Sequence, residues 1–505
     1  MTDSTSRATV PDGSSDKHVS DKRVGGVFAP AGFSWALFEF ARNPFYMIIV
    51  TYVFPPYFQT FVIGDAVRGQ AEVAATTGWA GIIAALTCPV LGSMMDKGGP
   101  RKPLMMLFVG MLVVTCVALW WALPGTRDAA GVFHSPTAGL GAAGTMSFLV
   151  LSYVGYSYSE MMHNAMLRSS GRPRSLSQIS GAGIGLGQLA SALFLAGVVF
   201  IAVAAPQLGT EEGGYALQRG VGPVLAVWLL VFVIPFFLFT PDGHPAGGSW
   251  KRAFRETFSI NGKIDPIGRA IGIFSYLRGL FRSYPEAMKY LLACLIFKDG
   301  ITALLAIGGV YSAGVLGWGL AEAGLYGIWA SLFGAVGGLW LAGALDRAVG
   351  PRRSIMIQLG LLCAAFAFAL GITQDSILYG LIPAGQVIHG AGVFDTLADV
   401  TYLGIIAVVA ALAAANIAAS RYMIVQVAPP ERLSEFFGLF AMSSTATVWI
   451  GPVLVNLFTN ASHDQRIGFS PVLLLLGVGL LLMMTLKKTT GGKPNAPGAA
   501  APPAH

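Results

Sequence analysis

Long apolar stretches recur from one end of the chain to the other, and they constrain the fold more than any other feature. A helix needs about 20 mainly apolar residues to cross a bilayer. Only 11% of the 505 residues are charged, whereas soluble proteins carry about 25%. The sequence therefore predicts an all-α membrane protein. Twelve transmembrane helices are expected, over residues 33–58, 76–95, 104–123, 144–166, 179–204, 222–240, 289–313, 322–345, 354–373, 400–420, 435–459 and 468–486.

Basic residues in the loops indicate the orientation. Loops that stay in the cytoplasm carry an excess of Lys and Arg. With both termini in the cytoplasm, most of the 32 basic residues fall on the inner side. We therefore expect a multi-pass protein of the cell (inner) membrane. The outer loops hold only Arg68, Arg127, Arg219 and Arg466.

One further apolar stretch, 377–394, contains Pro383, several glycines and His389. Counting it as a span would place Arg421 and Arg432 outside and weaken the charge bias. We interpret it as a re-entrant or surface segment.

A polar segment divides the chain into two halves. Residues 31–240 and 289–487 each contain six predicted spans, and 241–288 lies between them as a cytoplasmic basic linker. The linker suits either a docking platform or an amphipathic segment on the membrane surface. Residues 1–30 and 488–505 are expected to be disordered cytoplasmic tails.

The two halves repeat a motif. Residues 92–102 (GSMMDKGGPRK) follow the second span, and residues 346–353 (DRAVGPRR) follow the eighth. Duplicated six-span halves of one topology are typical of parallel-repeat transporters, whose site lies between the halves near the midplane.

The first motif resembles the loop signature of the major facilitator superfamily. A narrower resemblance, to the vacuole-effluxer-like branch related to the fungal autophagy-linked vacuolar amino-acid exporter, covers both halves. It rests on residues 34–45 (SWALFEFARNPF), 297–300 (FKDG), 419–421 (ASR), 435–439 (EFFGL) and 451–452 (GP). The resemblance implies the major facilitator fold, with two pseudo-symmetric six-helix halves, and export of amino acids.

The sequence departs from that branch at three positions. The branch usually has aspartate where Glu39 stands and asparagine where Arg42 and Lys298 stand. Two neutral positions have thus become cationic, one in the first helix of each half. These changes favour an anionic substrate over a neutral amino acid.

Arg42 and Lys298 are the central candidates for substrate binding. A charge at the centre of a spanning helix costs about 2.5–3.5 kcal/mol, so such residues face a wet cavity or a partner. Two cations facing one cavity suit a carboxylate or phosphate. Alternatively, Glu39 neutralises Arg42 on the same helix face, and Asp299 neutralises Lys298. The predicted substrate-binding residues are Arg42, Lys298, Glu39, Tyr46, Tyr156 and Asn416.

The fourth span carries a polar stripe in which Tyr153, Tyr156, Glu160, His163 and Asn164 share one helix face. Carboxylates and a histidine in such a stripe can carry protons. The alternative is a stripe that lines the cavity without titrating. The predicted proton-coupling residues are Glu39, Glu160, His163 and Asp299.

The repeated motif implies, by the family resemblance, a gate that holds the cytoplasmic helix ends together in one conformation. The alternative is charge that only sets topology. Arg421 is either a second gate contact or an anchor that snorkels to the membrane surface. The predicted gating residues are Gly92, Asp96, Lys97, Arg101, Lys102, Asp346, Arg347, Arg352 and Arg421.

Other classes of function lack support. The sequence has no GxxxxGK[ST], HExxH or GxSxG motif, so we expect no enzyme activity, cofactor or metal. The formal charge of +7 is spread over many loops, whereas nucleic-acid binders gather it on one face. The expected partners are a small-molecule substrate and the lipid bilayer, and the protein is expected to be a monomer.

The leading hypothesis is a proton-coupled secondary transporter that moves a small polar, anionic or carboxylate-bearing metabolite by alternating access. One alternative is an exporter of neutral or zwitterionic amino acids. The alternative from another class is a non-transporting receptor or assembly factor on the same fold.

Overall fold

The computed structural model describes residues 25–487 except 129–131, 244–247, 261–262, 265–272, 319, 389, 391, 446–449 and 463–464. Most of the two predicted terminal tails lies outside the described residues.

The N-terminal half begins with a broken helix and continues with five long ones. Its elements are α1 (Pro30–Arg42), η1 (Tyr46–Tyr52), α2 (Phe54–Tyr57), η2 (Phe58–Ile63), α3 (Ala66–Lys97), α4 (Lys102–Ala118), η3 (Leu119–Trp121), the hairpin β1 (Thr126–Arg127) and β2 (Phe133–His134), α5 (Gly141–Ala165), η4 (Leu167–Ser169), η5 (Pro173–Ser175), α6 (Leu176–Ala204), η6 (Pro206–Gly209) and α7 (Ala216–Phe239).

The linker and the C-terminal half follow. The linker contains α8 (Trp250–Phe258), the hairpin β3 (Ser259–Ile260) and β4 (Lys263–Ile264), and α10 (Ile273–Ser283). The C-terminal half contains α11 (Pro285–Val315), α12 (Leu320–Val336), η7 (Gly337–Ala342), α13 (Gly343–Val349), α14 (Pro351–Ala369), the hairpin β5 (Ser376–Ile377) and β6 (Ile382–Pro383), α15 (Leu397–Val427), η8 (Pro430–Arg432), α16 (Leu433–Thr445), α17 (Ile450–Ser462), α18 (Gln465–Phe469) and α19 (Pro471–Thr485).

The predicted all-α membrane fold is confirmed. Within the described residues, nine helices are long and apolar enough to cross a membrane. The other three predicted spans are also helical: α5, α11, and α16 with α17. α5 and α11 carry the polar residues from which the candidate site was predicted. The segment 377–394 is no span, because β5 and β6 form a short antiparallel hairpin there.

Proline breaks the first span near its middle. α1 ends at Arg42, and Asn43-Pro44 follows before the π-helical η1. Pro44 has no N–H to donate and its ring crowds the preceding turn, which interrupts a regular helix. Glu39 and Arg42 therefore lie in the last turn of α1, just before the break.

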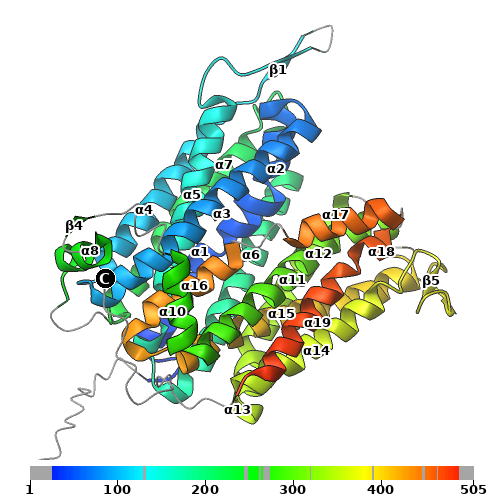
Figure 1. Ribbon diagram of the computed structural model, residues 1–505. Helices are drawn as coiled ribbons and strands as arrows, with labels where there is room; N and C mark the ends of the chain where they lie inside the picture. Colours follow the sequence, from blue (N-terminus) through cyan, green and yellow to red (C-terminus); the bar gives the residue numbers. More distant parts are fainter. Residues whose placement is uncertain are drawn as a thin grey trace, which may run out of the picture.

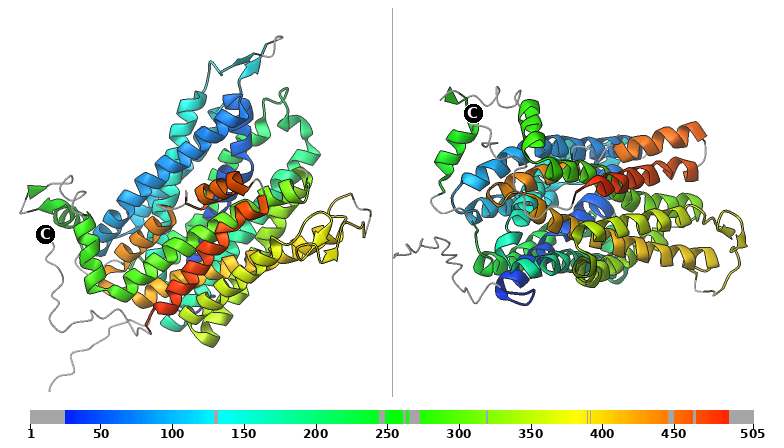
Figure 2. Two further views of the ribbon diagram at one scale, coloured as in Figure 1. Left: turned by 45° about the vertical axis from the view of Figure 1, so that its right-hand side comes forward. Right: turned by 60° about the horizontal axis from the view of Figure 1, so that its bottom comes forward.

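Helices of the two halves pack against each other in two main regions. α3 packs on α16, and α6 packs on α12, η7 and α15. We call the end at which α3 meets α4 the linker end, and the end that carries the hairpins β1–β2 and β5–β6 the hairpin end. Figures 1 and 2 show the halves together at the linker end, whereas the two hairpins lie far apart.

Glycines permit this close packing. A Cβ on Gly181 would lie 2.5 Å from the carbonyl oxygen of Gly338, and a Cβ on Gly438 would lie 2.5 Å from that of Cys88. Small residues let membrane helices approach closely. Gly181 and Gly185 of α6 thus serve the contact between the halves, whereas Gly183 and Gly187 face Trp35 and Asn43 of their own half.

Replacing Gly438 with alanine should destabilise the protein, because the new methyl group overlaps the backbone of α3. Overpacking of this kind costs about 1–3 kcal/mol. We expect a lower melting temperature of the purified protein in detergent. The matched control is Gly360→Ala on α14, where no described atom lies within 4 Å of the added Cβ. There the helix should be unchanged or more stable, and equal melting of both variants would contradict the packing argument.

Candidate functional site

Glu39 lies between two arginines from different halves of the molecule. Its Oε2 is 2.9 Å from Nη2 of Arg42, one turn further along α1, and its Oε1 is 2.8 Å from Nη1 of Arg421 on α15. All three side chains are at least 97% buried. The carboxylate therefore compensates both cations and joins the halves.

Glu160 on α5 binds the same two arginines more loosely. Its Oε2 is 3.5 Å from Nη1 of Arg42, and its Oε1 is 3.3 Å from Nη2 of Arg421. The Glu160 side chain is 34% exposed, whereas that of Glu39 is 2% exposed. Water thus reaches one carboxylate of the pair and not the other.

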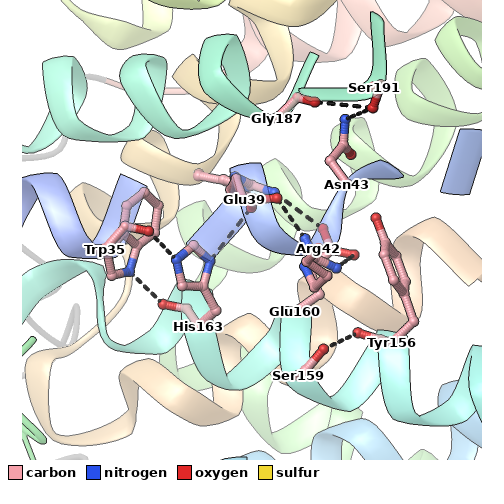
Figure 3. A network of polar contacts seen from close by, with 11 residues as sticks. Trp35, Glu39, Arg42, Asn43, Tyr156, Ser159, Glu160, His163, Gly187 and Ser191 are labelled. Carbon is pink, nitrogen blue, oxygen red and sulfur yellow. Dashed lines mark hydrogen bonds and ion pairs between the residues drawn. The ribbon is translucent and has the colours of Figure 1, made fainter. Parts of the chain in front are cut away.

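Aromatic rings and His163 surround this network (Figure 3). The Arg42 guanidinium lies 4.1 Å from the centre of the Tyr156 ring. His163 stacks on Trp35, and its Nε2 is 2.8 Å from the Trp35 carbonyl oxygen. Because a carbonyl only accepts, Nε2 carries a hydrogen. Nδ1 faces Oε1 of Glu39 at 3.5 Å, so a second proton on His163 would point toward that carboxylate.

Lys298 completes the site from α11. Its Nζ lies 3.6 Å from the centre of the Phe440 ring, a cation–π contact. It also interacts electrostatically with Glu160 and Arg421. We call Glu39, Arg42, Glu160, Arg421 and Lys298 the ion cluster. It draws on α1 and α5 of one half and on α11 and α15 of the other.

The remaining predicted binding and coupling residues divide into two groups. Tyr46 is 41% exposed and lies beside Tyr156, with ring centres 6.3 Å apart, so it borders the ion cluster. Asn416 is buried on α15 and accepts a hydrogen bond from Ser420 of its own helix. Asp299 accepts from the backbone N–H of Gly451 at 3.0 Å. That contact directs Asp299 toward α17 and away from the ion cluster.

Two predicted gating residues contact the other half in matching ways. Asp96, near the end of α3, accepts from the backbone N–H groups of Ser434 and Glu435 in the first turn of α16, at 3.0 and 2.8 Å. Asp346, on α13, accepts from the Ser177 hydroxyl in the first turn of α6, at 2.5 Å. A carboxylate is stabilised at a helix N-terminus. The repeated motif therefore places a carboxylate against the first turn of a helix of the other half twice, once through backbone N–H groups and once through a hydroxyl.

Gly92 and Arg101 support the first of these contacts. A Cβ on Gly92 would lie 2.4 Å from the Ser434 carbonyl oxygen. Arg101 approaches Asp96, with Nη2 3.7 Å from Oδ1.

Other predicted gating residues act within one half or in the linker. Lys102 donates to the carbonyl oxygen of Phe237, and Arg352 donates to those of Met483 and Met484. Arg347 is exposed. Lys97 pairs with Glu256 on α8 at 3.6 Å.

Arg421 lies elsewhere than predicted. A snorkelling anchor does not describe it, because its guanidinium is buried in the ion cluster, where it pairs with Glu39 and Glu160 of the other half. α15 continues to Val427, past the predicted end of the span at residue 420. Arg421 is therefore inside the helix, not at its end.

Sequence reasoning missed the partners of the two aspartates. Ser177 and Ser434 each lie in the first turn of a helix from the opposite half. The duplicated aspartates were a usable signal, since equivalent residues of two halves contact equivalent helices. Trp35, one turn before Glu39 on α1, was also missed.

Comparisons with solved structures agree with this architecture. The proton:xylose symporter XylE shares it with a TM-score of 0.63 and 12% identity, covering 92% of this chain and 96% of that one. The human organic anion transporter MFSD10 gives a TM-score of 0.57 and 13% identity, covering 90% and 98%. At these identities the likeness shows the fold alone. The protein thus has the fold of these major facilitator transporters.

Sequence comparison gives the family. The model described as "Vacuole effluxer Atg22 like" matches residues 138–496, so the chain belongs to this family. The predicted resemblance is confirmed, and the protein is a multi-pass membrane transporter of the major facilitator type.

Two relatives illustrate the spread of the family. The uncharacterized MFS-type transporter YxiO of Bacillus subtilis (strain 168) is 21% identical over 470 residues, which are 90% of this chain and 95% of YxiO. Autophagy-related protein 22 of Coccidioides immitis (strain RS) is 24% identical over 323 residues, 62% of this chain and 49% of the relative. The match thus spans about half the length of that fungal protein. These relatives favour transport over the receptor alternative, and the protein is not an enzyme.

Replacing Glu39 with glutamine should strongly destabilise the fold, because Arg42 and Arg421 would lose their shared buried counter-charge. Breaking a buried ion pair costs roughly 3–5 kcal/mol. We expect a marked fall in the melting temperature of the purified protein. The double variant Glu39→Gln/Arg42→Gln should recover part of it, since one uncompensated cation is removed as well. A single variant as stable as the parent would show that Glu39 is not the anchor.

Proposed function

We propose that this transporter moves a small anionic, carboxylate-bearing metabolite and binds it at the ion cluster. The observation that carries the proposal is the composition of the cluster. Its members are three cations, Arg42, Arg421 and Lys298, and two carboxylates, Glu39 and Glu160. Cations from both halves thus converge on one place, where a substrate carboxylate can bind to them.

Glu160 marks the position at which substrate enters. Its contacts with the arginines are longer than those of Glu39, and its side chain is one-third exposed. A substrate carboxylate can take its place, because a guanidinium binds carboxylates through two parallel N–H donors. Lys298 then supplies a second positive contact from the other half.

Proton coupling follows from the same asymmetry. Protonation of Glu160 removes its attraction to Arg42 and Arg421 and frees both for the substrate. His163 and Glu39 lie 3.5 Å apart and form the inner part of the same polar path. Proton uptake and substrate binding are thereby linked through the arginines.

Alternating access uses the contacts at the linker end. In the described conformation, Asp96 and Asp346 hold the first turns of α16 and α6. For the linker end to open, both contacts must break while the halves rotate about the ion cluster. We place this end in the cytoplasm of a monomer in the cell membrane, since the linker-end loops are rich in basic residues.

A second candidate is export of neutral or zwitterionic amino acids, as the family description "vacuole effluxer" suggests. Glu39 and Glu160 cancel the charges of Arg42 and Arg421. In that case Glu160 takes the substrate amino group and an arginine takes the carboxylate. Charge selectivity separates the two candidates.

Replacing Lys298 with glutamine should weaken binding of acidic ligands about 10- to 100-fold, since a hydrogen bond to a charged group contributes about 1.5–3 kcal/mol. The measurement is a thermal-shift screen of the purified protein against metabolites grouped by charge, because a ligand stabilises the state it binds. The control is Lys289→Gln on the same helix, where Lys289 is 47% exposed and pairs with Glu286.

Anionic ligands that stabilise the parent and Lys289→Gln but not Lys298→Gln would support the proposal. Hits confined to neutral amino acids, unaffected by Lys298→Gln, would favour the second candidate.

Replacing Glu160 with glutamine should abolish uptake driven by a pH gradient while leaving substrate exchange across the membrane. Glutamine mimics the protonated carboxyl group, so the arginines stay free but no proton is carried. Proteoliposomes loaded with a ligand from the screen measure both activities. The control is Glu431→Gln, an exposed position at the start of η8. Gradient-driven uptake that persists in Glu160→Gln would place the coupling elsewhere.

A further inference from the structure

The linker between the halves presents a basic surface at the linker end. Figures 1 and 2 show α8 and α10 at the edge of the bundle there. Ala253 and Leu280 are buried, while the opposite sides of both helices carry exposed cations. The only acidic residue on the described parts of these helices is Glu256, which pairs with Lys97 and Arg252. The exposed cations, here called the basic face, are Lys251, Arg252, Arg255, Arg278 and Arg282.

The basic face lies beside the linker-end termini of two predicted spans. α8 lies against the loop that follows α3, since the Trp250 indole donates a hydrogen bond to the Pro100 carbonyl oxygen at 3.0 Å. α10 leads into α11, which begins at Pro285. Phe281, 41% exposed, lies among the cations of α10. Basic amphipathic helices with exposed aromatic residues bind in the headgroup layer.

The same helices contact both partners of the Asp96 gate. α8 holds the loop after α3 through the Trp250 hydrogen bond and the pair between Lys97 and Glu256. α10 reaches α16 through Tyr276, whose hydroxyl accepts from Arg432 at 2.8 Å. Arg432 in turn binds Glu435 with two hydrogen bonds.

We propose that the basic face of α8 and α10 binds anionic phospholipid headgroups in the leaflet at the linker end, and that this binding favours the closed linker end. Anionic lipids attract polybasic segments held at the surface. Within the described residues, no ion pair satisfies Lys251, Arg255, Arg278 or Arg282. Headgroups fixing α8 and α10 also fix the α3 and α16 ends to which these helices are bonded.

The first measurement tests whether α10 lies in the headgroup layer of the membrane. A spin label at Gly279→Cys, with the four native cysteines replaced, reports accessibility to oxygen against a water-soluble nickel chelate. Phosphatidylcholine nanodiscs with and without phosphatidylglycerol provide the comparison. Phosphatidylglycerol should raise oxygen access relative to nickel, as α10 settles into the headgroup layer.

The second measurement tests whether the linker end is open or closed. Spin labels at Arg174→Cys and Ala348→Cys, exposed positions beside α6 and α13, give the separation of the halves at the linker end. Phosphatidylglycerol should increase the ratio of short to long distances by at least about fivefold, the effect that one cation supports near an anionic surface.

Two charge-matched variants decide the outcome. Lys251→Gln/Arg255→Gln/Arg282→Gln should lose both lipid effects. Arg168→Gln/Arg172→Gln/Arg353→Gln, which removes three exposed cations outside α8 and α10, should keep them. No lipid effect on the parent, an equal response of both variants, or a change at Gly279 without a change in distance would overturn the proposal. Neither measurement uses a substrate, so either can fail while the proposed function stands.

Discussion

The structure depends on one compensated charge in a bundle surrounded by lipid. A lone ion at the centre of a spanning helix is costly, and a buried pair is stable only while both partners remain. Glu39 meets this constraint for Arg42 and Arg421 together. Because Arg421 belongs to the other half, the interaction that makes the buried charges stable also fixes where the halves meet. The contact between the halves and the proposed substrate site therefore share the same few side chains.

The contacts at the linker end also join the two halves. Asp96 and Asp346 each bind the first turn of a helix from the opposite half, and the ion cluster lies between the same halves. In the proposed cycle, a rotation that separates the linker end turns α1 against α15 around the Glu39–Arg421 pair. A ligand or proton that alters the charge on Arg421's partners thus biases the gate without touching it. Such coupling is reciprocal, so opening the gate must also change affinity at the cluster.

The sequence was most informative where helix geometry alone decides. Glu39 and Arg42 are three residues apart, a spacing that places them on one face, and the structure pairs them. The same geometry argues against Asp299 as a partner of Lys298, since adjacent residues of a helix do not face each other, and Asp299 instead binds Gly451. The position of Arg421 in the ion cluster could not be predicted from the sequence. The length of α15 depends on its packing against other helices, among them α6 and η7. The composition of a span does not show how far its helix continues past the apolar stretch.

The two carboxylates of the ion cluster divide the work by their access to water. A group that exchanges protons or yields to a substrate must be reached from solvent and must hold its partners weakly. Glu160, one third exposed and 3.3–3.5 Å from its arginines, meets both conditions. Glu39, buried and within 2.9 Å of both, meets neither. In the proposed cycle, Glu39 therefore maintains the positions of Arg42 and Arg421, and Glu160 is the carboxylate whose departure makes those positions available.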